Sequence, residues 1–278
     1  MLRLFALLLC LFALPVAAQQ RVALVVGNGS YTNAKPLPNA TNDARDIAQK
    51  LRSQGFQVFE GIDVGRLDTL RLIEKFNRAI TPEDTALFYF AGHGLQIGAE
   101  NWLMPVDAQQ GDEVAITNTS IRLRTVLRGM ELRAGNRIVI LDACRNNPFL
   151  VAGASRSADG SATRGLSRIE AGVGSYIAFS TQPGNVALDG RGRNSPFTAA
   201  LLRHLGSEGE DIHAVMRAVR SDVVNASGGT QVPWENSSLI DPLYLVPTAA
   251  ETSGRKGVRL PKAQAGLTQP PVTIGQPP

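Results

Sequence analysis

The feature that most constrains the fold is an alternation of short, mostly apolar runs with amphipathic stretches. The runs are Val22 to Val26, Phe56 to Phe59, Ala86 to Ala91, Ile138 to Leu141 and Tyr176 to Phe179. Strands that are buried on both faces have this composition, because helices cover both sides of a parallel sheet. A further strand is expected over Leu243 to Val246. The sequence therefore predicts an α/β fold with a mostly parallel six-stranded sheet and helices on both faces.

Residues 1–18 have the composition of a secretory signal peptide. Arg3 precedes an apolar run from Leu4 to Leu14, and small residues end the segment at Ala18. A positive start, an apolar middle and small residues at the end mark a leader that is removed after export. The run is also shorter than the roughly 20 residues of a membrane span. We expect cleavage after Ala18 and no stable membrane span afterwards; an uncleaved membrane anchor is the alternative.

Removal of such a leader would leave the mature chain with a single cysteine. The chain has 2 Cys, which are Cys10 in the apolar run and Cys144. Without Cys10, Cys144 has no partner for an intramolecular disulfide, and a leftover thiol in a secreted protein is a candidate reactive group. The alternative is a small buried apolar residue, as many unpaired cysteines are.

Two chemically active side chains follow two of the apolar runs. His93 comes shortly after Ala91, and Cys144 comes shortly after Leu141. Parallel neighbouring strands end at one edge of the sheet, where open α/β folds bind their ligands. A histidine in hydrogen-bond reach can take the thiol proton, and the thiolate is the competent nucleophile. The amides of Gly94 and Cys144 are then candidates for an oxyanion hole. If each residue is considered alone, the alternatives are a structural turn histidine at position 93 and a buried core cysteine at position 144.

The residues around this pair resemble those of caspase-like peptidases. A caspase signature carries Ala-Cys-Arg about fifty residues after its histidine, and His93 has that separation from Asp142-Ala143-Cys144-Arg145. The Asp in place of the Gln of animal caspases is similar to metacaspases and their bacterial relatives, the orthocaspases. Further stretches with this similarity are residues 89–94, 103–108, 180–184, 192–197 and 231–234.

The resemblance covers residues 21–246 and implies a fold, an activity and a location. The fold is a caspase-like α/β/α sandwich. The activity is cysteine endopeptidase activity through a Cys144–His93 dyad and an acyl-thioester. The location implied together with the leader is the bacterial periplasm.

A specificity pocket also follows from the resemblance. In metacaspases, one Asp two residues before the nucleophile and another early in the first helix line the pocket for the residue before the cut. Asp142 and Asp43 match these two positions. Two carboxylates favour a cation, and Arg can engage them in a bidentate way, so we predict protein or peptide substrates that are cut after Arg or Lys. The alternatives are a first-turn acid at Asp43, which the helix dipole favours, and a structural strand-end acid at Asp142.

Two segments lack a periodic apolar pattern. Residues 151–174 are rich in Gly, Ala, Ser and Arg and correspond to the linker between the large and small portions of the peptidase. Arg156, Arg164 and Arg168 are candidate self-cleavage sites in this flexible loop, and a merely flexible connection is the alternative. Residues 247–278 hold few large apolar groups, which predicts a disordered tail.

No cofactor and no nucleic-acid partner are expected. Calcium-dependent metacaspases carry acidic residues after their small hairpin, where this chain has Glu100 but no acid in residues 116–120. Hard cations need several oxygen ligands, so the sequence argues against calcium activation, although Asp112 and Glu113 leave it open. The formal net charge is +4, but the chain has no dense basic run interleaved with aromatic residues. Such a run would indicate nucleic-acid binding.

Two rival functions are weighed against a peptidase. One is a caspase-fold protein that binds a partner without cutting, which the retention of both His93 and Cys144 disfavours. The other is a different thiol enzyme, such as an acyltransferase, which an assay of peptide turnover would distinguish. The sequence does not determine the oligomeric state.

Overall fold

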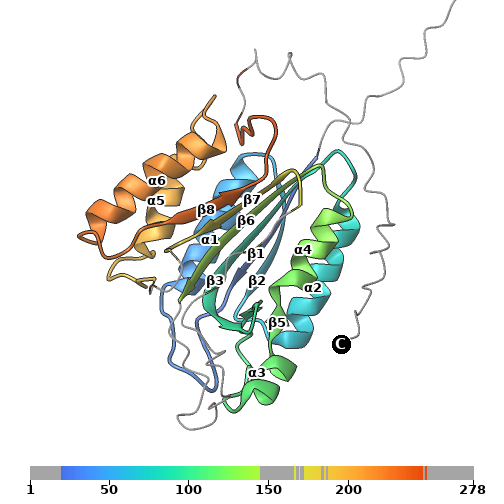
Figure 1. Cartoon of the computed structure of the whole chain (residues 1–278), viewed down its shortest axis with the longest axis vertical. Coiled ribbons are helices and arrows are strands. Elements are labelled where there is room, and N and C mark those ends of the chain that lie inside the picture. Colours follow the sequence, from blue (N-terminus) through green and yellow to red (C-terminus); the bar gives the residue numbers. More distant parts are fainter. Residues whose placement is uncertain are drawn as a thin grey trace, which may run out of the picture.

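The computed structural model describes residues 20–144, 166, 169, 172–182, 185, 187–246 and 248. Within them the chain forms three layers, with helices on both faces of a twisted sheet (Figure 1). The strands are β1 (Arg21–Gly27), β2 (Gln57–Ile62), β3 (Thr85–Ile97), β4 (Glu100–Leu103), β5 (Ile121–Arg122), β6 (Asn136–Cys144), β7 (Ser175–Phe179) and β8 (Trp234–Ser237). The helices are α1 (Ala40–Ser53), α2 (Arg66–Ala79), α3 (Glu113–Thr119), α4 (Leu123–Glu131), α5 (Pro196–His204) and α6 (Ile212–Ala226).

The main sheet has the strand order β2-β1-β3-β6-β7-β8. Neighbours on this path are parallel except for β7 and β8, which are antiparallel. In β1, Ala23 and Val25 enter one core, whereas Val22 and Leu24 enter the other. A strand with two buried faces needs apolar residues at every position, which explains the continuous apolar runs. The predicted α/β architecture with a mostly parallel sheet is confirmed.

Different helices cover the two faces of the sheet. α1, α5 and α6 lie on one face, and α2 and α4 lie on the other (Figure 1). Ile47 and Leu51 of α1 recur at helical spacing and are buried, as are Ile73 and Phe76 of α2. Burial of one such side chain contributes about 1.5–3 kcal/mol. These apolar stripes therefore fix which face of each helix meets the sheet.

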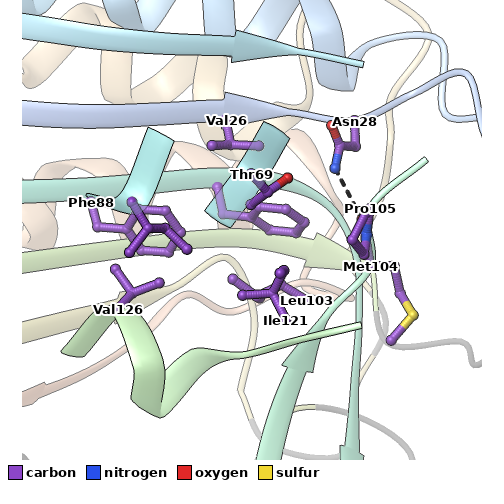
Figure 2. Close-up of a pocket in the computed structure, with 11 residues that line it drawn as sticks. Val26, Asn28, Thr69, Phe88, Leu103, Met104, Pro105, Ile121 and Val126 are labelled. Carbon is purple, nitrogen blue, oxygen red and sulfur yellow. Dashed lines mark hydrogen bonds between the residues drawn. The ribbon is translucent and has the colours of Figure 1, made fainter. Parts of the chain in front are cut away.

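The core between β1, β3, α2 and α4 is closely packed. Its cavity measures about 10 Å³, which leaves room for no more than about one water molecule. Figure 2 shows Val26, Phe88 and Val126 around it. At its polar end the Asn28 amide donates a hydrogen bond to the Met104 carbonyl at 3.0 Å. This contact holds the segment that follows β4 against the end of β1.

β3 continues beyond the main sheet into a small hairpin. It pairs with β1 as far as Ala91, and from Gly94 onward it pairs antiparallel with β4, which in turn pairs with β5. β3 and β4 thus form a hairpin, to which β5 adds a third short strand. His93 lies inside β3, at the junction between the two pairings, and not after a strand that ends at Ala91. The longer strand reflects the hairpin pairing, which an apolar-run pattern cannot reveal.

The sixth strand of the main sheet is β8, and the prediction of that strand over Leu243 to Val246 is wrong. β8 is an edge strand with partly exposed residues, so it lacks the apolar run that marks central strands. Leu243 and Leu245 are buried, and Tyr244 forms an isolated bridge with Asp211 before α6. The apolar composition of this segment thus reflects packing and not a ladder of strand hydrogen bonds.

Several predicted segments lie outside the described residues. They are the signal peptide over residues 1–18, the tail over residues 247–278 apart from Thr248, and most of residues 151–174, including Arg156, Arg164 and Arg168. In the part of the chain that the structure describes, no helix combines the length and apolarity that crossing a membrane requires.

Candidate active site

His93 and Cys144 occupy paired positions of neighbouring strands. β3 and β6 run parallel from Thr85 opposite Asn136 to His93 opposite Cys144. The register is strongly specified, because a slip by one residue would turn every buried side chain to the other face. The backbone therefore brings the two residues together at the carboxyl edge of the sheet. The side chain of Cys144 lies outside what the structure describes.

The imidazole of His93 is buried and held by a main-chain group. Its Nε2 lies 2.9 Å from the carbonyl oxygen of Lys35. A carbonyl only accepts, so this contact assigns the proton to Nε2 and leaves Nδ1 as the basic nitrogen. Burial lowers the pKa of His93 from its ordinary 6.5, and the hydrogen bond to the Lys35 carbonyl opposes that shift. The neutral, base-competent form is therefore favoured near neutral pH.

Tyr31 is a second buried partner of His93, and the sequence reasoning did not identify it. The main-chain N–H of His93 donates to the Tyr31 hydroxyl at 2.7 Å, and that hydroxyl donates to the Met104 carbonyl at 3.3 Å. The two rings lie 4.5 Å apart between centroids, tilted by 47°. A Cβ at position 92 would lie 2.6 Å from the Tyr31 hydroxyl, so the close approach requires Gly92.

Asp43 and Asp142, which the resemblance assigns to a specificity pocket, are buried near each other, close enough for the charge of Asp142 to act on Asp43. Asp43 comes from the first turn of α1, and Asp142 comes from β6, two residues before Cys144. They are 2% and 7% exposed, and they share hydrogen-bond donors at the start of α5. The Ser195 N–H donates to Asp43 at 3.1 Å, while the Ser195 hydroxyl and the Thr198 hydroxyl donate to Asp142. Ser195 also caps α5 by accepting from the Thr198 N–H.

The carboxyl groups of Asp43 and Asp142 resist ionisation because they are buried. Burial, followed by the nearby charge of Asp142, raises the pKa of Asp43 to about 8. Burial also raises the pKa of Asp142, to about 6, while hydrogen bonds from Ser195, Thr198 and Ser180 limit that rise. Two like charges in a dry site cost free energy that a bound cation would remove.

Asp189 adds a third carboxyl group that the sequence reasoning missed. It is half-buried, burial raises its pKa, and its charge raises the pKa values of both Asp43 and Asp142. The Asn39 amide fixes its backbone by donating to the Asp189 carbonyl at 2.6 Å. A lone acid in a Gly-rich loop gives no periodic signal, so only the fold reveals its place beside the pair.

The segment that carries Asp189 is braced by a buried glutamine. Gln231 is fully buried and accepts a hydrogen bond from the Leu188 N–H at 3.1 Å. Its amide donates to the Ser180 carbonyl at 2.8 Å, just after β7. The 231–234 stretch noted in the sequence therefore holds the main chain beside Asp189 in place.

The acidic residues considered for calcium have other partners. Glu100 forms an ion pair with Arg124 at 3.4 Å, and the Asp112 carboxylate accepts from the Ala115 N–H at the start of α3. Across the described residues, no group of three or more His, Cys, Asp or Glu side chains is arranged to hold a metal ion.

The chain is similar to two curated proteins over part of its length. These are mucosa-associated lymphoid tissue lymphoma translocation protein 1 of Homo sapiens and its homolog of Mus musculus. Each is 26% identical over 129 residues, which is 46% of this chain. The matched region is only 15% of the length of those relatives.

Two solved structures share the fold. Caspase-1 of Spodoptera frugiperda aligns with a TM-score of 0.60 and 18% identity, covering 83% of this chain and 93% of that chain. A protein of Geobacter sulfurreducens aligns with a TM-score of 0.57 and 16% identity, covering 80% and 94%. At these identities the likeness concerns the fold alone.

A protein-family model assigns most of the chain to a family. The model described as the caspase domain matches residues 20–244, which include the whole main sheet, His93 and Cys144. Because this match spans most of the chain and the fold agrees with it, the protein belongs to the caspase domain family of cysteine peptidases.

Proposed function

We propose that this protein is an endopeptidase that cuts peptide bonds after Arg or Lys. The observation that carries the proposal is the pairing of His93 with Cys144 beside the buried carboxyl groups of Asp43 and Asp142. A thiol nucleophile needs an adjacent base, and a basic substrate side chain needs a negatively charged pocket. The strand register supports the first part of the proposal, and the buried carboxyl groups support the second.

The proposed reaction proceeds through an acyl-thioester. His93 takes the proton of the Cys144 thiol, and the thiolate attacks the carbonyl carbon of the scissile bond. The C–N bond then breaks as His93 gives the proton to the leaving amine. Water, deprotonated by His93, attacks the thioester and releases the new carboxylate together with the restored thiol. The amides of Gly94 and Cys144 are the proposed donors to the oxyanion in both steps.

The contacts of His93 support this role for a dyad without a third catalytic side chain. The Lys35 carbonyl fixes the tautomer, as an acidic partner does in other histidine sites. Tyr31 anchors the backbone of His93 and packs against its ring. We assign both as positioning groups, because they contact His93 and not the reacting atoms.

The specificity pocket is proposed to hold a guanidinium or ammonium group between Asp43 and Asp142, with Asp189 at its rim. The raised pKa values imply that the empty pocket carries protons near neutral pH. A cationic side chain would displace these protons and pair with the carboxylates. An uncharged side chain would leave two acids in a dry site without compensation.

We expect the preference for a cationic residue to grow with pH. Asp43 and Asp142 have pKa values of about 8 and about 6, so raising the pH through this range ionises the pocket. The measurement compares two peptides that differ only in Arg or citrulline before the cut. Their ratio of kcat/KM cancels the titration of His93 and Cys144 and is expected to rise between about pH 6 and about pH 9. A constant ratio would remove the carboxyl pair from substrate recognition.

Tyr31→Phe is expected to lower kcat about tenfold with little change in KM. The ring stays in place, but the N–H of His93 loses its acceptor in a buried site, which costs about 1–3 kcal/mol. The acid limb of the kcat profile should also move, because it reports His93 in the enzyme–substrate complex. Tyr244→Phe is the control, since Tyr244 lies near the opposite edge of the sheet, where the Arg21 guanidinium reaches the neighbouring Leu245 carbonyl. Equal effects of the two variants would contradict the positioning role.

The proposal is tested with the protein from Gln19 onward and fluorogenic peptides that end in Arg, Lys or Asp. Turnover after Arg or Lys that disappears in Cys144→Ala is the expected result. Turnover after Asp would keep the peptidase and reject the acidic pocket. An absence of turnover with every peptide, with and without calcium, would favour a caspase-fold protein that binds a partner without cutting.

We propose further that the chain is exported and acts in the bacterial periplasm after loss of residues 1–18. Self-cleavage after Arg156, Arg164 or Arg168 would follow from the same preference for basic residues. Mass spectrometry of the incubated protein and of its Cys144→Ala variant tests the self-cleavage, and the mass of the protein recovered from the periplasm tests the loss of the leader. Cleavage at these arginines only in the protein with Cys144 is the expected outcome, and identical fragments in the two samples would reject it.

A further inference from the structure

A polar hollow lies on the side of the hairpin, away from the acidic pocket. It is bounded by the start of α2, by α3, by β4 and β5 and by the start of α4. Its volume is about 370 Å³, within the range of sites that hold small molecules. The polar side chains and the aromatic residue that line it include Arg66, Trp102, Thr117, Ser120, Arg122 and Thr125.

Two arginines, Arg66 and Arg122, line this hollow without an ion-pair partner among the described residues. Most other ion pairs among the described residues involve a surface arginine, for example Arg71 with Asp68 and Arg124 with Glu100. Arg66 and Arg122 form no ion pair within the described part of the chain. Their charges are therefore not neutralised by the protein around them.

The two arginines are also held in defined positions. The Nε of Arg66 donates to the Ser120 carbonyl at 3.3 Å, which leaves the terminal N–H groups for another acceptor. The guanidinium of Arg122 lies 5.0 Å from the centre of the Trp102 ring and is stacked over it. Stacking on an aromatic face is a common way to orient arginine for recognition of an anion. Ordered arginines lose less conformational entropy when they bind.

The remaining surroundings favour donors over acceptors. The indole N–H of Trp102 is buried and has no hydrogen-bond partner among the described residues. Asp107 lies at the start of α2, but its carboxylate accepts from the main-chain N–H of Arg66 there. Glu100 is engaged by Arg124. The hollow thus presents two cations and several donors, with neighbouring acids already bound elsewhere.

We propose that this hollow binds a soluble small molecule that bears a phosphate group. Guanidinium groups match the oxygens of phosphate through parallel hydrogen bonds, and the threonine and serine hydroxyls around them add further donors. Because two guanidinium groups line the hollow, the proposed ligand is an anion and not a divalent cation.

The test measures binding of pyrophosphate by the fluorescence of Trp102. The chain has 2 Trp, so Trp234→Phe leaves Trp102 as a reporter in the wall of the hollow. Saturable binding with a Kd near or below about 1 mM is expected. Arg66→Gln and Arg122→Gln should each weaken it about tenfold or more, because each removes a charged hydrogen-bond donor. Arg71→Gln on the same helix is the control and should stay within about twofold, since Arg71 pairs with Asp68 outside the hollow.

Three further arms define the outcome. Sodium chloride at the same ionic strength should give no saturable change in fluorescence, because chloride cannot bridge the two forks. Malonate separates phosphate from carboxylate recognition, and malonate binding tighter than pyrophosphate would overturn the proposal. Binding to phosphatidic acid vesicles without binding to pyrophosphate would also overturn it, because the ligand would then be a lipid surface. Equal affinity of the parent and all three arginine variants would show nonspecific attraction only.

Discussion

Replacing His93 by alanine is expected to lower kcat for an arginyl peptide by about 1000-fold or more, within the range attributed to general base catalysis. The protonated thiol of Cys144 is a poor nucleophile, and without the imidazole no neighbouring group removes its proton. KM should change little, because the acidic pocket remains intact. The three His residues of the chain allow a matched control: His204→Ala removes an imidazole that pairs with Asp222 on the surface and should keep full activity.

A chemical measurement separates activation of the thiol from damage to the fold. In the protein from Gln19 onward, Cys144 is the single cysteine, so alkylation by iodoacetamide reports one site. The rate near neutral pH should be higher in the parent protein than in His93→Ala, and the two rates should converge well above the ordinary pKa of about 8.5 for a thiol. Equal rates at all pH values, with activity retained, would show that His93 does not activate Cys144.

Asp43→Asn is expected to lower kcat/KM for an arginyl peptide by about 30-fold to about 5000-fold at pH near 8.5. Loss of one partner from a buried charge pair costs about 2–5 kcal/mol. The citrulline peptide should be cut with nearly unchanged efficiency, because it places no charge beside position 43. Asp68→Asn is the matched control: Asp68 also stands in the first turn of a helix, but it pairs with Arg71 on the surface. Equal losses for both peptides would place Asp43 outside the specificity pocket.

The same Asp43→Asn substitution should have the opposite effect on stability. The folded-state pKa values of about 8 for Asp43 and about 6 for Asp142 lie above the ordinary 3.8. Between pH 3.8 and these raised pKa values, the folded protein therefore binds more protons than the unfolded chain. The free energy of unfolding falls as the pH rises through this range. An asparagine side chain does not ionise, so the variant should gain in Tm relative to the parent between about pH 5 and about pH 8.5. A Tm difference that is independent of pH would contradict the shifted pKa of Asp43.

The central part of the fold is readable from the sequence because burial on two faces leaves a simple pattern. Val22 to Val26 and Ile138 to Leu141 are apolar at each position, and both become central strands. β8 carries no such pattern, because an edge strand that is partly exposed needs no apolar run. The buried Leu243 and Leu245 imitate a strand, since packing against a helix start needs apolar residues just as a sheet does.

Part of the candidate site can be proposed from the sequence, where one side chain has one chemical role. His93 and Cys144 follow apolar runs, and Asp43 and Asp142 match positions of a known family pattern. Tyr31 was missed because its contact with His93 joins residues far apart in the chain, through a hydroxyl that any buried tyrosine carries. Asp189 was missed because its effect on the pocket depends on the path of a loop that Asn39 and Gln231 hold in place.

The acceptor that orients His93 belongs to the main chain of Lys35, and this has an evolutionary consequence. No exchange of one side chain for another at position 35 deletes a carbonyl oxygen, so the orienting group cannot be lost by a simple missense change there. Substitutions at position 35 therefore leave the tautomer of His93 unchanged. Selection acts instead on the length and path of the loop between β1 and α1. An insertion or deletion in this loop would move the Lys35 carbonyl away from His93. The vulnerable unit is thus a segment of backbone, and its conservation would be visible in spacing more than in residue identity.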